Sequence, residues 1–163
     1  MTTGSEPKKS LEAMPREQFE QYVSEFIESN NVCVLGTAQD NIPRATPLEY
    51  EAEGTTLYIM VDRGRKIDNM KANPNISVVI NNPLHGWLTV KGLQITSRAI
   101  LITDSDSEYV SAWKIFNRAN SSKEGWDIPP KGGTLLKVVP QKMELTETAL
   151  KDKGYKMKQV WEA

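Results

Sequence analysis

Three short runs near the middle of the chain decide the fold: VCVLGT (residues 32–37), RATPLEY (residues 44–50) and TLYIMV (residues 56–61). They are rich in residues that favour strands and too short for helices, so each predicts a strand. The segments between them contain QDN (residues 39–41) and EG (residues 53–54), which are typical of tight turns. Consecutive hairpins at this spacing predict an antiparallel β-meander.

Pro43, just before the second run, and Pro47, within it, place that strand at a sheet edge or next to a bulge, because proline cannot donate to a sheet ladder. The fold class is expected to be α+β, with a closed or partly closed antiparallel barrel, since no βαβ alternation appears. Further strands are expected at residues 76–80, within the β-rich stretch 87–103, and at residues 134–139 and 142–145.

Three helices are expected around these strands. Pro15 suits the first position of a helix. An apolar stripe follows it at helical spacing: Phe19, Tyr22, Val23, Phe26 and Ile27. A short helix over residues 67–72 ends before Pro74, because the residue preceding a proline is pushed out of the α region. Residues 104–106 (DSD) are expected to cap a third helix, whose apolar face carries Tyr109, Val110, Trp113 and Phe116.

The composition is that of an ordinary globular domain. Residues 1–10 are polar and lack a period, so we expect a disordered lead-in followed by a single domain over residues 11–163. The sequence contains 20 Lys and Arg residues and 21 Asp and Glu residues. The net charge of −1 shows none of the excess positive charge expected of a protein that binds nucleic acid or an anionic membrane. No apolar run approaches the roughly 18 residues of a membrane span, and no signal peptide is recognised, so a cytoplasmic location is expected.

Cysteine and histidine are too scarce for several kinds of site. The single cysteine, Cys33, excludes an internal disulfide and a cysteine-based zinc centre, and its apolar strand predicts a buried, inert thiol. The single histidine, His85, makes a histidine-rich metal site or a hydrolase relay hard to build. We therefore expect no metal site, and we expect any chemistry to come from a bound cofactor.

The basic turn RGRKI (residues 63–67) is the most informative candidate site. Arg65 and Lys66 stand at the start of the short helix, where unpaired backbone N–H groups and the helix dipole already favour an anion. Gly64 lets the backbone approach a ligand, so the turn predicts a phosphate cradle. A solvated basic turn is the alternative. Arg44, at the start of the second strand, points either inward to the same ligand or outward into water.

In their order and spacing, five segments resemble the pyridoxamine 5′-phosphate oxidase-like family of FMN-binding split barrels: VCVLGT (32–37), PRATPL (43–48), LYIMV (57–61), RKIDNM (65–70) and NPNIS (73–77). The resemblance extends from about residue 15 to residue 145. It implies a mostly antiparallel split β-barrel with flanking helices, and FMN as the cofactor. It also implies a homodimer with FMN at the subunit interface.

The resemblance further implies which residues hold FMN. The family's phosphate-binding step falls on Arg65 and Lys66, and its second-strand arginine falls on Arg44. The next two positions fall beside the flavin ring, and backbone groups of residues 59–61 fall at the edge of the ring. The implied cofactor-binding residues are Arg44, Ala45, Thr46, Ile59, Met60, Val61, Arg65 and Lys66. A dianionic phosphate suits paired cations and helix amides.

The implied activity is that of an FMN-dependent oxidoreductase, which passes hydride or electrons between a nicotinamide donor, NAD(P)H, and a small acceptor. No arginine follows Arg118, so the arginine-rich C-terminal clamp of the family's founding enzyme is missing. We therefore expect a relative that does not oxidise pyridoxamine phosphate. The alternatives are a non-catalytic flavin-binding or electron-transfer module, a deazaflavin protein, and a haem protein that would use His85.

Two tryptophans in polar stretches, Trp126 and Trp161, each need an apolar surface to cover. Each could fold over the flavin, pack across a dimer partner, or fasten its own segment to the domain. We favour the last of these roles.

Overall fold

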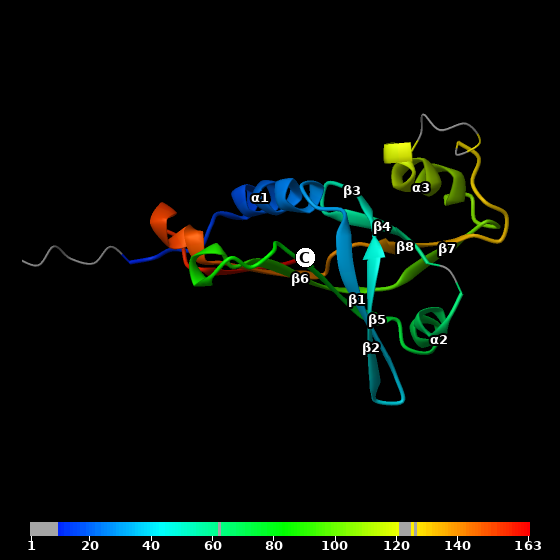
Figure 1. Cartoon of the computed structure of the whole chain (residues 1–163), viewed down its shortest axis with the longest axis horizontal. Coiled ribbons are helices and arrows are strands. Elements are labelled where there is room, and N and C mark those ends of the chain that lie inside the picture. The colour runs from blue at the N-terminus through cyan, green and yellow to red at the C-terminus, as the bar shows by residue number, and fades with distance from the viewer. Residues whose placement is uncertain (1–9, 62, 121–124, 126) are drawn as a thin grey trace, which may run out of the picture.

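The computed structural model describes residues 10–61, 63–120, 125 and 127–163, and Figure 1 shows their arrangement. The helices are α1 (Arg16–Glu28), α2 (Arg65–Ala72) and α3 (Tyr109–Phe116), with 3-10 turns η1 (Trp87–Thr89), η2 (Arg118–Asn120) and η3 (Thr148–Lys153). The strands are β1 (Val32–Gln39), β2 (Ile42–Glu49), β3 (Glu51–Glu53), β4 (Thr56–Met60), β5 (Asn75–Asn81), β6 (Lys91–Arg98), β7 (Ile100–Thr103), β8 (Thr134–Val138), β9 (Lys142–Glu147) and β10 (Lys158–Glu162).

The strands form two antiparallel sheets, and at two places the chain bends and continues from a strand of one sheet into a strand of the other. One sheet has the order β10-β9-β6-β5-β1-β2 and the other β3-β4-β8-β7. The chain passes from β2 into β3 at Tyr50 and from β6 into β7 at Ala99. The strands therefore close into a barrel. Starting from β1, each strand pairs with or continues into the next, in the order β1, β2, β3, β4, β8, β7, β6, β5 and back to β1. The predicted α+β class, a mostly antiparallel split barrel with flanking helices, is confirmed.

Strand β2 is an edge strand, as its two prolines predict. It pairs with β1 along its whole length, from Gln39 opposite Ile42 to Val32 opposite Glu49, and it ends the six-stranded sheet. Two residues, Asp40 and Asn41, connect β1 to β2, and both have positive φ (53° and 61°). Such a turn is favoured in two-residue hairpins because its twist matches that of the strands.

Helix α1 covers the barrel with the stripe that its sequence predicts. Phe19, Val23, Phe26 and Ile27 are all buried in the barrel core. Beside them lies a partly buried polar cluster. The Tyr22 hydroxyl is 2.9 and 3.0 Å from the two Glu147 carboxylate oxygens, and Lys91 Nζ is 3.2 Å from Glu147 Oε2. Burial, with the hydrogen bond to Glu147, raises the pKa of Tyr22 to about 12. This cluster fastens α1 to β6 and β9.

Helix α3 packs on the outer face of the four-stranded sheet, away from the barrel core (Figure 1). The helix begins at Tyr109, so the predicted cap at residues 104–106 is wrong. The Asp106 carboxylate is engaged instead by the backbone N–H and the hydroxyl of Thr103, at 2.7 and 2.8 Å. Val110, predicted on the apolar face, is 51% exposed, because the face that packs carries Tyr109, Ala112 and Trp113.

The C-terminal segment adds a strand, β10, that the sequence did not predict. Trp161 in this strand donates from Nε1 to Glu20 of α1 at 2.5 Å, and the Arg16 guanidinium lies 4.7 Å from its ring centroid. Trp161 thus fastens the C-terminal segment to α1. Trp126 and residues 1–9 lie outside the described residues. Among the described helices, none is long and apolar enough to cross a membrane.

Candidate functional site

Strands β1 and β2 place Arg44 on the inner face of the sheet. Thr37 is the cross-strand partner of Arg44, and paired residues of antiparallel strands lie on the same face. Thr37 is buried beneath α2, whereas the Arg44 side chain is exposed at the edge. The direction in which Arg44 points, left open by the sequence, is therefore inward, towards α2.

Helix α2 begins at Arg65, two residues earlier than the sequence predicts. Gly64 precedes it with φ = 121°, a backbone conformation that residues with a Cβ rarely adopt. The helix buries Asn69 and Met70, and Asn69 Nδ2 donates to Thr37 Oγ1 at 3.0 Å. Arg65 stands one helical turn before Asn69, so both side chains lie on the face directed at β1 and β2.

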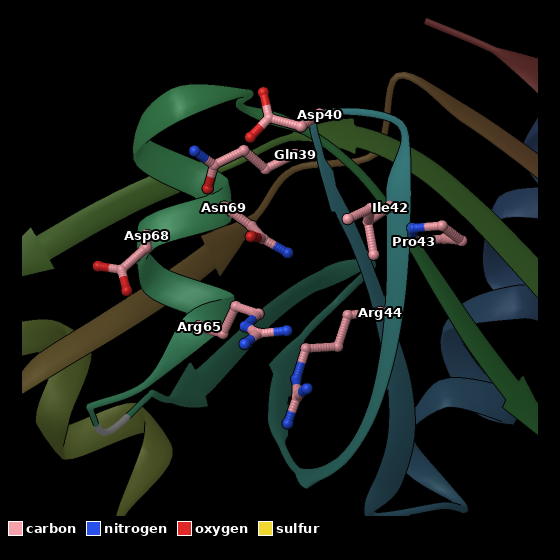
Figure 2. Close-up of a pocket in the computed structure, with 8 residues that line it drawn as sticks. All are labelled: Gln39, Asp40, Ile42, Pro43, Arg44, Arg65, Asp68 and Asn69. Carbon is pink, nitrogen blue, oxygen red and sulfur yellow. The ribbon is translucent and has the colours of Figure 1, made fainter.

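Arg44 and Arg65 meet at a pocket of about 380 Å³ between α2 and the β1–β2 hairpin. Figure 2 shows both guanidinium groups extending into the same space, while Asp68 points away from β2. Among the described residues, neither arginine forms an ion pair with a carboxylate. The pocket is lined by Gln39, Asp40, Ile42, Pro43, Arg44, Arg65, Asp68 and Asn69.

Lys66, the other half of the predicted cationic pair, does not line this pocket. Its Nζ donates to the backbone oxygen of Arg63 at 3.4 Å, across the turn. The structure therefore brings together Arg44 and Arg65, rather than Arg65 and Lys66, at the pocket.

Ala45 and Thr46, predicted beside one ligand, have side chains on opposite faces of β2. Thr46 is paired with Leu35 and faces the barrel interior. Ala45 is paired with Gly36 on the outer face, and both line a second hollow of about 560 Å³ that Arg44 also borders. Gln39 and Ile42 form the hydrogen-bonded pair next to the hairpin turn. From there, residues of β2 alternately direct their backbone N–H towards β1 and towards the open edge, and that of Ala45 points to the open edge. Only its backbone is therefore available to a ligand at that edge.

Residues 59–61 also have only backbone groups available to a ligand, because their side chains are packed inside the protein. Ile59 and Val61 are buried in the barrel core, and Met60 packs on the outer cluster beneath α3. Strand β3 pairs with β4 only as far as Tyr58, while β8 continues along the other side of β4 to Met60. In the described part of the chain, this leaves one edge of β4 open beyond Tyr58, next to the open edge of β2.

The sequence did not single out Asn69, Gln39 or Asp40 as parts of the site. A signal for Asn69 was present, since it follows Arg65 by one helical turn. Gln39 and Asp40 were interpreted as turn residues, and only the approach of α2 to the hairpin makes them line a pocket.

Cys33 and His85 lie apart from the arginine pocket. Cys33 is buried in the barrel core, and burial raises its pKa to about 12, so it is an inert thiol as predicted. His85 is exposed in the loop before η1, where its backbone N–H donates to Thr89 Oγ1 at 2.9 Å. The described residues contain no cluster of three or more histidine, cysteine, aspartate or glutamate side chains suited to a metal.

Comparison with known proteins identifies the family. Residues 19–145 match the sequence profile of the pyridoxamine 5′-phosphate oxidase family, and the chain belongs to that family. No match was found among curated protein sequences.

Solved structures support the same fold. A putative pyridoxamine 5′-phosphate oxidase from Listeria innocua is 23% identical, with a TM-score of 0.62, over 78% of this chain and 97% of that chain. A FAD-binding protein from Mesorhizobium loti is 22% identical, with a TM-score of 0.60, over 75% of this chain and 87% of that chain. A haem-binding protein from Mycobacterium smegmatis is 16% identical, with a TM-score of 0.68, over 91% of this chain and 60% of that chain.

The residues at the arginine pocket fit a phosphorylated ligand. Two guanidinium groups converge there without a carboxylate partner among the described residues, and guanidinium is well matched to phosphate oxygens. The open edge of β2 offers backbone donors and acceptors beside it. FMN combines a terminal phosphate with a flat polar-edged ring, so its chemistry suits this donor set.

Proposed function

We propose that this protein binds FMN and acts as an oxidoreductase between NAD(P)H and a small acceptor. The single observation that supports the proposal most is the convergence of Arg44 and Arg65 on one pocket, where neither forms an ion pair with Asp40 or Asp68, the two carboxylates that line it (Figure 2). A guanidinium group without an ion-pair partner is available to a ligand, and two such groups on one pocket favour an anion. The terminal phosphate of FMN supplies that anion.

In this proposal each part of the site has a separate task. Arg44 and Arg65 bind the phosphate and so fix the position of the cofactor. Backbone groups at Ala45 and at residues 59–61 orient the polar edge of the ring. The flavin itself, when bound, supplies the two-electron chemistry, and no acid or base from this chain is assigned to the reaction.

The pocket lies at the exposed edge strand β2, so a flavin held there would keep one side open to solvent. We propose that a second copy of the chain covers the ring, as the family resemblance implies, which makes the protein a homodimer with FMN at the interface. Light scattering of the protein with and without FMN tests the dimer independently of activity.

The proposed reaction excludes pyridoxamine phosphate as the substrate. The C-terminal segment, which forms η3 and β10, contains lysines and no arginine, and its Trp161 is already engaged with α1. A second phosphate clamp of arginines is therefore not available from this segment of the chain.

A haem-binding role is the second candidate, because the haem-binding protein from Mycobacterium smegmatis aligns with 91% of this chain. His85 would be the ligand available to the iron. It does not line the arginine pocket, so haem would occupy a different place on the protein.

The deciding experiment is the visible absorption spectrum of the purified protein, before and after loading with FMN and removal of the excess. A retained flavin spectrum, followed by bleaching with NADH or NADPH and recovery with an acceptor, is the expected result. Retention without NAD(P)H-dependent reduction would favour a binding module. A Soret band after haem addition, with no flavin uptake, would favour the haem role, and a released cofactor with a deazaflavin spectrum would favour that cofactor.

A further inference from the structure

A buried hydrogen bond joins α2 to β1 directly beside the arginine pocket. It runs from Asn69 Nδ2 to Thr37 Oγ1 at 3.0 Å. The exposed fractions of the two residues are 2% and 4%, so both polar groups are shielded from water. Asn69 also forms part of the pocket wall (Figure 2). The proposed function gives neither residue a role.

Each end of this bond belongs to a rigid unit that carries one of the two arginines. Asn69 and Arg65 are four residues apart in α2 and share a helix face. Thr37 and Arg44 are directly opposed in the β1–β2 ladder and share a sheet face. The bond therefore links the helix turn that presents one guanidinium to the strand pair that presents the other.

Packing alone does not call for a hydrogen bond at this place. Helix α2 already buries Met70 in the barrel core and packs Ile67 against it. An apolar pair of the same shape would also fill the space, because replacing both partners of a buried hydrogen bond is often nearly neutral for stability. An apolar contact, however, tolerates sliding, whereas a hydrogen bond fixes both distance and direction.

We propose that Thr37 and Asn69 are positioning residues that set the separation of Arg44 and Arg65, so that both guanidinium groups reach one phosphate. The proposal rests on the phosphate-binding role proposed above for the two arginines. Thr37 and Asn69 act through the arginines, by holding α2 in one register against β1.

The test measures binding of inorganic phosphate to the full chain by NMR, following the side-chain Nε–H signals of Arg44 and Arg65 separately. In the wild-type protein both signals should shift along one binding curve. In Thr37→Val the affinity should fall roughly tenfold, because even a small misplacement of binding groups is costly. Thr37→Ser keeps the hydroxyl and should restore the affinity.

A double variant separates positioning from folding. Thr37→Val alone leaves the Asn69 amide buried without its acceptor and should lower the melting temperature. Thr37→Val combined with Asn69→Leu removes both polar groups, so the melting temperature should recover while phosphate affinity stays low. Recovery of affinity together with stability, or wild-type affinity in Thr37→Val, would overturn the proposal.

Thr148→Val is the matched control. Thr148 is also buried, at 6% exposure, but it lies in η3, and its hydroxyl oxygen has no hydrogen-bond partner among the described residues. Its phosphate affinity should equal that of the wild type. If Thr148→Val lowers the affinity as much as Thr37→Val, the effect is not one of local positioning and the proposal fails.

Titration with FMN distinguishes the two possible failures. A wild-type protein that binds phosphate at both arginines but does not bind FMN refutes the proposed cofactor, and the phosphate curves of the variants still decide the positioning role. A wild-type protein whose two arginine signals do not respond to phosphate overturns the positioning proposal itself.

Discussion

Replacing Arg44 or Arg65 with glutamine should weaken FMN binding through the phosphate alone. Neither guanidinium has a carboxylate partner among the described residues, so each is free to give charge-assisted hydrogen bonds to a ligand. Such a bond contributes about 1.5–3 kcal/mol, and 1.4 kcal/mol is a factor of ten, so each substitution should raise the Kd for FMN roughly 10- to 150-fold. The double variant should lose less than the product, because both arginines act on one phosphate.

Folding should survive these substitutions. An exposed arginine without an ion-pair partner contributes little to stability, so the melting temperature should stay close to that of the wild type. The substitution Arg63→Gln is the matched control, because Arg63 is exposed on the same basic turn but does not line the pocket. Its Kd for FMN should change only slightly.

The assay is quenching of flavin fluorescence, with FMN and riboflavin titrated in parallel. Riboflavin lacks the phosphate, so its affinity should be the same in the wild type and in both arginine variants. If FMN and riboflavin weaken by the same factor, the arginines do not act on the phosphate. If Arg63→Gln weakens FMN as much as Arg65→Gln does, general charge rather than the pocket explains the binding. Either result would refute the site.

Three further predictions concern stability. Lys91→Met should cost about 3 kcal/mol in urea denaturation, because it removes the ion-pair partner of the nearly buried Glu147, and adding Glu147→Leu should recover most of the loss. Gly133→Ala should lower the melting temperature, at a cost of about 1–3 kcal/mol, because the new Cβ would lie 2.0 Å from the Tyr109 hydroxyl oxygen; Tyr109→Phe should recover part of that loss. Burial raises the pKa of Cys33 to about 12 in the folded protein, so the thiol ionises at a lower pH in the unfolded chain. The free energy of unfolding should therefore fall as pH rises above 9. Denaturation measured from pH 9 to 11 should show a less steep fall in Cys33→Ala.

Much of the fold follows from local patterns. The stripe of Phe19, Val23, Phe26 and Ile27 repeats at the helical period and packs against the barrel core, so periodicity alone identified α1. Strands β1, β2 and β4 were identified by short apolar runs between turns, and the prolines correctly placed β2 at an edge. They do not form one meander, however, because the chain bends at Tyr50 into the unpredicted strand β3, which pairs with β4 in the second sheet. In α1, β1 and β4 the apolar residues that determine the local structure also face the core, whereas the prolines of β2 are exposed.

Strand β10 could not be found in this way because its buried residue is polar. Gln159 faces inward, where its side chain accepts from the Met14 N–H at 2.7 Å and donates to the Lys156 backbone oxygen at 2.7 Å. Its neighbour Val160 is exposed. The hydrophobic alternation is thus inverted, and only hydrogen bonds to distant parts of the chain make this segment a strand.

The candidate site was predicted in part. Arg65 and Arg44 were named from the sequence, and their convergence on one pocket depends on how α2 docks, which no local pattern specifies. The register of the hairpin turn, once known, places Ala45 and Thr46 on opposite faces. Met60 was expected to meet the edge of the flavin ring through its backbone. Its side chain lies under α3, because one face of β4 packs on the barrel core and the other on the cluster beneath α3.

The prolines of β2 also bear on how the protein avoids aggregation. Along this strand, residues 43, 45 and 47 direct their backbone nitrogens to the open edge, and two of these three residues are proline. An open edge normally offers a row of amide protons on which a strand from another molecule can assemble. Here only Ala45 and, at the end of the strand, Glu49 supply amide protons to that edge, so β2 makes a poor template for intermolecular sheet growth, even though the proposed ligand site leaves its edge open.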